Sequence, residues 1–154
     1  MKIAIGSDHL GLELKSVIKD YLQEQEFVEV EVIDVGVVDT DPVDYPDIAE
    51  KVALEVASAR CERGILICGT GIGMAISANK VPGVRAAQAH DIYSAERSRK
   101  SNDAQIITLG ALVIGKELAK KIIGAWLVSD FGGGGSSQKV EKMKKLDERY
   151  RKSG

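Results

Sequence analysis

Short apolar runs rich in isoleucine and valine alternate along the chain with longer stretches of helical periodicity, and this alternation limits the fold more than any other feature. Five such runs, expected to be buried strands, cover residues 2–7, 28–35, 64–68, 84–89 and 105–109. Helices are expected between and after them, over residues 10–25, 47–60, 72–80, 93–100 and 116–128. Nearly continuous apolar strands that alternate with helices indicate a parallel sheet covered on both faces. We therefore predict an α/β doubly wound five-stranded sheet.

The C-terminal part of the chain has a different composition. With 154 residues the chain is long enough for one domain with a full core, so residues 1–154 are expected to form a single unit. Residues 129–137 contain four consecutive glycines and three serines, which is typical of a flexible hinge. A charged helix is expected over residues 138–151. We predict that residues 130–154 form an arm reaching a partner subunit; a solvent-facing tail is the alternative.

Composition excludes several classes of protein. A formal net charge of -2 without a basic stripe argues against a nucleic-acid binder. No apolar run approaches the roughly 18 residues needed to cross a bilayer, and the first apolar run is too short for a signal peptide, so a cytoplasmic protein without a membrane partner is predicted. The two cysteines, Cys61 and Cys68, are expected to be free thiols in that reducing compartment.

Doubly wound sheets bind ligands beyond the carboxyl ends of their strands, so the residues that follow each predicted strand are the candidate site. These are Asp8, His9, the loop of residues 39–45, residues 68–73, His90, Asp91 and Gly110. The two histidines, His9 and His90, can be structural or functional, and their shared placement favours function. Two histidines with scattered carboxylates lack the ligand spacing of a zinc site, so no metal is predicted.

The loop Gly69-Thr70-Gly71-Ile72-Gly73 lies between a predicted strand and a predicted helix, where its amides can converge on an anion. A dinucleotide fingerprint is an alternative, with Asp91 as the ribose-binding acid, but Met74 stands where that fingerprint needs glycine. A Walker A loop is excluded because its Gly-Lys-Ser/Thr end is missing.

Cys68 immediately precedes this loop, and two interpretations compete. Free cysteine is among the most buried residue types, so Cys68 can be an ordinary core residue. Its place at a strand end beside a helix N-terminus favours a thiolate and hence a base or nucleophile, which is the interpretation we prefer. Cys61 lies among charged residues at a predicted helix end and is taken as incidental.

A set of motifs resembles the ribose-5-phosphate isomerase B / galactose-6-phosphate isomerase family over nearly the whole chain. The motifs are residues 6–9 (GSDH), 44–47 (DYPD), 67–74 (ICGTGIGM), 77–87 (SANKVPGVRAA), 93–95 (YSA) and 102–104 (NDA). The resemblance implies a Rossmann-like homodimer that interconverts phosphorylated aldoses and ketoses without metal or cofactor, with active sites at the subunit interface. Whether dimers pair into tetramers is left open.

The resemblance also implies a role for each matching residue. Cys68 corresponds to the base that carries a proton between C1 and C2 of the sugar through a cis-enediolate, and Thr70 to a residue that assists through its hydroxyl. Stabilisation of the growing negative charge is physically required, and the amides of Gly69, Gly71, Ile72, Gly73 and Met74 are placed to provide it. Asp8, Tyr45 and Asn102 correspond to residues that hold the sugar hydroxyls. His9 corresponds to a residue near the phosphate.

Three positions depart from the family pattern. Ser101 stands where the family commonly has the histidine credited with opening the cyclic sugar, and a serine hydroxyl is no general acid or base near neutral pH without an activating partner. Leu112 replaces an arginine. The tail motif of the family has two arginines, and here only Lys139 supplies a positive charge for the phosphate. Arg97, Arg99 and Lys100 are further candidates to supply it.

These departures leave three functional hypotheses. In the first, His90 opens the ring and the substrate is of the ribose 5-phosphate type. In the second, the substrate is a four-carbon sugar phosphate, such as erythrose 4-phosphate, that cannot close the usual furanose because its C4 oxygen is esterified. In the third, the chain binds a phosphosugar without turning it over.

Overall fold

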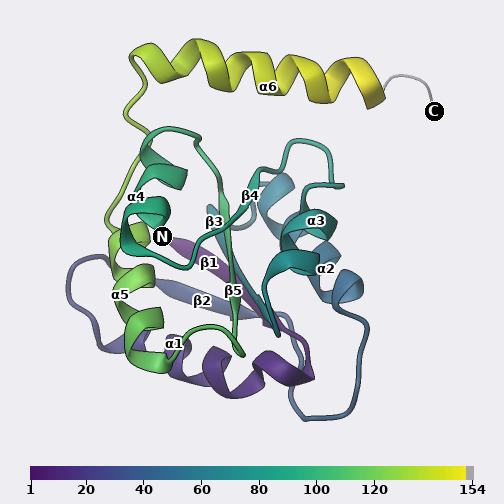
Figure 1. Cartoon of the computed structure of the whole chain (residues 1–154), viewed down its shortest axis with the longest axis vertical. Helices are drawn as coiled ribbons and strands as arrows, with labels where there is room; N and C mark the ends of the chain where they lie inside the picture. The colour runs from purple at the N-terminus through teal and green to yellow at the C-terminus, as the bar shows by residue number, and fades with distance from the viewer. Residues whose placement is uncertain (152–154) are drawn as a thin grey trace.

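The computed structural model describes residues 1–151, which form one parallel sheet flanked by helices (Figure 1). The strands lie side by side in the order β2-β1-β3-β5-β4, and every neighbouring pair is parallel. Their bounds are β1 Lys2–Ser7, β2 Glu31–Asp34, β3 Arg63–Cys68, β4 Ala86–Gln88 and β5 Ile106–Gly110. The predicted α/β doubly wound sheet is confirmed. We call the edge where the strands end the carboxyl edge, and the edge where they begin the amino edge.

Helices cover both faces of the sheet. The first face carries α1 (Leu12–Glu24), α4 (Ile92–Lys100) and α5 (Lys116–Leu127), and the second carries α2 (Tyr45–Ala57) and α3 (Ile72–Ala78). A short 3-10 helix, η1 (His9–Gly11), connects β1 to α1. Because each connection between parallel strands must cross a face, the helices place every βα loop at the carboxyl edge.

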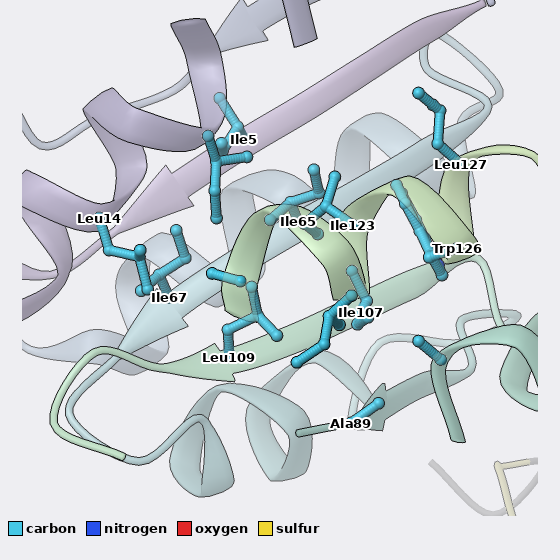
Figure 2. Close-up of a cluster of buried hydrophobic side chains, with 14 of the residues drawn as sticks. Ile5, Leu14, Ile65, Ile67, Ala89, Ile107, Leu109, Ile123, Trp126 and Leu127 are labelled. Atoms are coloured by element: carbon cyan, nitrogen blue, oxygen red, sulfur yellow. The ribbon is translucent and has the colours of Figure 1, made fainter. Parts of the chain in front are cut away.

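Alternation of side chains along the strands divides the core into two layers. Ile65 and Ile67 of β3 pack with the first-face helices, whereas Leu66 and Cys68 pack with the second-face helices. Figure 2 shows the first-face cluster, in which Ile65 and Ile107 of the strands lie close to Ile123 of α5. Because Cys68 is the last residue of β3 on the second face, its sulfur lies on the side of α2 and α3.

The two outer strands differ from the prediction that all five are buried. Residues 28–35 and 84–89 were expected to be strands, but β2 and β4 are shorter and partly exposed. Their positions at the two ends of the sheet leave one side of each strand without a partner. Apolar content alone cannot separate such edge strands from the central ones.

The C-terminal arm lies outside the helical layers (Figure 1). Its helix α6 (Gly135–Arg151) begins three residues earlier than predicted and, with 17 residues, is mostly polar. The far end touches the body of the chain, where the Asp147 carboxylate accepts from the Gly83 amide at 3.0 Å and the Arg151 guanidinium donates to the carbonyls of Asn79 and Lys80. A cavity of about 960 Å³ separates this part of α6 from residues 79–85. Within residues 1–151 no helix has the length and apolar character needed to span a membrane.

Candidate active site

The ends of β1, β3 and β5 bring most of the predicted site residues to one edge of the sheet. The register pairs Ser7 with Ile67 and Cys68 with Gly110, so these three strands end level with one another. The Asp8 amide donates to the Ile67 carbonyl at 3.2 Å, which carries the pairing one residue beyond β1. The β1/β3 pair is also where the strand order reverses direction, and a ligand crevice is expected at such a point.

The Cys68 sulfur faces the glycine loop. Its Sγ accepts a hydrogen bond from the Gly71 amide at 3.1 Å, and the side chain is 5% exposed. Gly71 has a φ of 77°, in the left-handed region that favours glycine. A Cβ at this position would also lie 2.9 Å from the Leu109 carbonyl carbon, so only glycine fits. The thiol is therefore part of the loop's hydrogen bonding as well as of the core.

Thr70 and Ile72 are the exposed residues of the loop. The Thr70 Oγ1 atom accepts from the Ile72 amide at 3.3 Å. Of the amides predicted to form an oxyanion cradle, that of Gly71 thus points at sulfur and that of Ile72 at the Thr70 hydroxyl. Each of these two amides therefore donates to a group that the family resemblance links to chemistry.

Tyr45 reaches the same loop from the start of α2. A Cβ added to Gly73 would lie 2.4 Å from Cε2 and 2.8 Å from the hydroxyl oxygen of Tyr45, so the ring packs directly against the glycine. The Tyr45 side chain is 41% exposed, which leaves part of the ring accessible to a ligand. Tyr45, predicted to hold a sugar hydroxyl, therefore lies in direct contact with the glycine loop.

Asp8 and His9 line the site from the end of β1. The Asp8 Oδ1 atom accepts from the amides of Leu10 and Gly11 at 3.0 and 3.1 Å, and these bonds fix the carboxylate as the cap of η1. The Nδ1 atom of His9 accepts from the Val43 amide at 3.3 Å. A neutral His9 consequently carries its proton on Nε2, which becomes a hydrogen-bond donor.

His90 also lies at the carboxyl edge, after β4, but one nitrogen is already used. Its Nε2 accepts from the Gly110 amide at 2.9 Å, so the neutral ring carries its proton on Nδ1. Burial lowers the pKa of His90, and the nearby Asp91 carboxylate opposes that effect only in part. His90 is therefore a neutral hydrogen-bond donor. Asp91, the acid of the dinucleotide alternative, instead caps α4 by accepting from the Ser94 amide at 2.6 Å.

Asn102 and Lys139 are not brought to this site within one chain. The loop of residues 101–105 leads into the start of β5, and the Gln105 carbonyl accepts from the Gly64 amide at the start of β3. Asn102 thus lies at the amino edge, across the sheet from Cys68. Ser101 lies beside it, with its hydroxyl accepting from the Arg97 guanidinium. Lys139 is exposed on α6.

Two polar residues that contact the glycine loop were missed from the sequence. Gln88 donates to the Thr70 carbonyl and Thr108 to the Gly71 carbonyl, each at 2.7 Å. Both lie inside runs that were read only as apolar strands, residues 84–89 and 105–109. A polar side chain inside an apolar run is the signal that could have identified them, and for the buried Thr108 the reason is that a buried polar group needs a partner.

Comparison with known proteins identifies the family. The model of the Ribose/Galactose Isomerase family matches residues 3–143. This chain belongs to that family. It is 57% identical over 151 residues to the ribose-5-P isomerase B of Listeria innocua, covering 98% of this chain and 100% of the relative. It is 55% identical over 143 residues to the D-erythrulose-4-phosphate isomerase of Pectobacterium atrosepticum, covering 93% of each.

Solved structures agree with the family assignment. The ribose-5-phosphate isomerase B of Clostridium thermocellum superimposes with a TM-score of 0.93 at 48% identity, over 97% of this chain and 99% of that one. A type B ribose 5-phosphate isomerase from Trypanosoma brucei gives a TM-score of 0.90 at 41% identity, over 94% and 97% of the two chains. The predicted family resemblance and the Rossmann-like fold are confirmed, and the chain is an isomerase.

Proposed function

We propose that this isomerase interconverts a phosphorylated aldose and its ketose, with Cys68 as the base. The thiolate removes the proton on C2 of the open-chain aldose, and the electrons of that C–H bond form a cis-enediolate whose charge rests on O1. The sulfur then returns the proton to C1, while the hydroxyl proton on O2 moves to O1, leaving the ketose. The observation that carries this proposal is the sulfur at the carboxyl edge, 3.1 Å from a loop amide.

The neighbouring groups suit the remaining tasks. A proton can leave carbon only if the charge that develops on the adjacent oxygen is stabilised. Thr70 presents an exposed hydroxyl in the glycine loop, close to Cys68. Asp8 and Tyr45 are proposed to hold sugar hydroxyls. The Nε2–H of His9 is proposed to donate to the phosphate.

The primary candidate for the substrate is of the ribose 5-phosphate type, in agreement with the names of the Listeria innocua and Clostridium thermocellum relatives. A four-carbon sugar phosphate is the second candidate, and two contacts favour it. The Ser101 hydroxyl is occupied by Arg97, and the His90 Nε2 is occupied by the Gly110 amide. In these contacts the Ser101 hydroxyl has no base beside it, and His90 offers only the Nδ1–H of a neutral imidazole, a weak acid, for ring opening. The Pectobacterium atrosepticum relative is named for such a four-carbon substrate.

The role of Cys68 is tested by solvent deuterium exchange. The wild-type enzyme should introduce deuterium from solvent at C1 or C2 of its sugar phosphate, and Cys68→Ala should abolish this exchange while the sugar phosphate still binds. Cys61→Ala, which changes the other buried thiol, is the matched control and should retain exchange. Full exchange in the Cys68→Ala variant would show that Cys68 is not the base. Binding without any exchange in the wild-type protein would indicate a phosphosugar-binding relative.

The substrate is tested with His90 variants on ribose 5-phosphate and erythrose 4-phosphate. His90→Gln retains an acceptor for the Gly110 amide, whereas His90→Ala removes it. If His90 only supports the loop, His90→Gln should be active on both sugars and His90→Ala should lose activity on both equally. A loss confined to ribose 5-phosphate in both variants would instead show that His90 opens the ring.

The position of Asn102 supports a homodimer as the active unit. This residue lies across the sheet from Cys68, so it can hold a sugar hydroxyl only in the site of a second copy. The arm of residues 130–154, of which the last three lie outside the described residues, is proposed to reach that copy, and Lys139 is proposed to supply charge for the phosphate. Cytoplasmic localisation is proposed with it.

A further inference from the structure

Two strand residues donate hydrogen bonds to consecutive carbonyls of the glycine loop, residues 69–73. The side-chain amide nitrogen Nε2 of Gln88 on β4 donates to the Thr70 carbonyl, and the hydroxyl of Thr108 on β5 donates to the Gly71 carbonyl, each at 2.7 Å. Thr108 is fully buried and Gln88 is exposed at the end of its strand. The loop they hold has glycine at alternate positions and would otherwise have unusual conformational freedom.

Peptide geometry converts these two contacts into an effect on the site. A trans peptide is planar, and its N–H points away from the carbonyl oxygen of the preceding residue. Holding the Thr70 carbonyl therefore aims the Gly71 amide the opposite way, toward the Cys68 sulfur at 3.1 Å. In the same way, holding the Gly71 carbonyl aims the Ile72 amide at the Thr70 hydroxyl, 3.3 Å away.

We propose that Gln88 and Thr108 are positioning residues, which fix these two peptide planes and so keep Cys68 and Thr70 in their reactive arrangement. The inference rests on the proposed role of Cys68. The N–H that donates to the sulfur holds it in one orientation and stabilises the negative charge that it carries when it removes a proton or reacts with an alkylating agent. Without either anchor, the peptide spends part of its time turned away, and the reactivity of the thiol falls. Substrate binding by Asp8 and His9 is unaffected, since neither residue contacts the anchors.

The test compares four variants for alkylation of Cys68 and for steady-state kinetics. Thr108→Val removes the hydroxyl with little change in shape, and Thr108→Ser retains it as the conservative rescue. Gln88→Leu removes the second donor, and Gln23→Leu makes the same change at an exposed position on α1. Iodoacetamide is the probe at neutral pH, and peptide mass mapping separates Cys68 from Cys61. Circular dichroism confirms that each variant is folded.

Thr108→Val and Gln88→Leu should each lower the alkylation rate of Cys68 and kcat by roughly threefold to tenfold, the effect of one hydrogen bond, with KM within about twofold of wild type. Thr108→Ser and Gln23→Leu should match the wild type. If Thr108→Val does not fold, Gln88→Leu decides alone. Alkylation that stays at the wild-type rate or rises in the folded variants overturns the proposal. Alkylation does not depend on turnover, so this readout holds even if Cys68 is not the base.

Discussion

Gly73 determines where the Tyr45 ring can lie. A Cβ at Gly73 would come within 2.4 Å of the ring, so Gly73→Ala must displace Tyr45 from the loop. We expect KM for the sugar phosphate to rise by roughly threefold to tenfold, the effect of one lost hydrogen bond, because the proposed contact between Tyr45 and a sugar hydroxyl is lost. Steady-state kinetics check this.

Gly115→Ala is the matched control for Gly73→Ala. No atom lies within 4 Å of a Cβ added there, and its φ of -80° suits alanine, so KM should not change. An unchanged KM in Gly73→Ala as well would show that Tyr45 does not hold the sugar. Alanine also has a higher helix propensity than glycine in the first turn of α3, and this offsets part of any loss of stability in Gly73→Ala. The effect on KM can therefore be separated from an effect on stability.

His90 gives the fold a pH dependence that can be signed from its surroundings. Burial lowers the pKa of His90, so the unfolded chain binds a proton more readily than the folded one. The contribution of neutral His90 to the free energy of unfolding is therefore complete above the ordinary histidine pKa. It is lost as the pH falls through the lower pKa that His90 has in the folded chain. Urea unfolding at a series of pH values should show a steeper acid loss for wild type than for His90→Gln. Parallel profiles would contradict this.

At the scale of elements, Arg63 joins the start of β3 to the end of α5. Its guanidinium donates to the carbonyls of Trp126, Leu127 and Ser129 at 2.8, 3.2 and 2.8 Å, and to the Asp130 carboxylate at 2.7 Å. Burial lowers the pKa of Arg63 to about 10, the Asp130 carboxylate opposes this, and the side chain stays charged at neutral pH. The direction in which the arm leaves the core depends on this clamp.

Arg63→Lys should lower the free energy of unfolding by about 2–4 kcal/mol, because an ammonium cannot reach four acceptors on a planar fork and the carbonyls lose their donors. Urea denaturation measures the change. Arg60→Lys is the control, since the exposed Arg60 forms an ion pair with the Glu55 side chain at the surface and its replacement should change stability by less than about 0.5 kcal/mol. Equal effects in the two variants would exclude the clamp.

The same elements show which parts of the molecule are predictable from sequence. Central strands follow from isoleucine-rich runs, because burial on both faces requires continuous apolar residues, and the carboxyl-edge rule then places Asp8, Cys68 and His90 together. The edge positions of β2 and β4 could not be predicted, since strand order depends on tertiary packing. Gln88 and Thr108 were missed because hydrophobic periodicity gives no information about what a polar strand residue contacts.

For the whole molecule, a single chain leaves the rim of its site apolar and exposed. Leu10 and Leu112 both lie next to Gly69 and are 50% and 74% exposed, and Ile72 of the loop is 52% exposed. Apolar side chains gathered around a polar site are typical of a surface that another protein covers. Together with Asn102 at the far edge of the sheet, this arrangement supports two sites shared between two copies.

A mixing experiment tests that sharing. Cys68→Ala and Asn102→Ala each damage both sites of a homodimer if Cys68 and Asn102 of different copies form one site. A mixed dimer then has one site with both defects and one intact site, so random mixing should restore about a quarter of wild-type activity. The subunits are mixed by unfolding and refolding them together, and each variant refolded alone is the control. If both residues served the same copy's site, every site of a mixed dimer would carry a defect, and mixing would restore nothing above the average of the two controls.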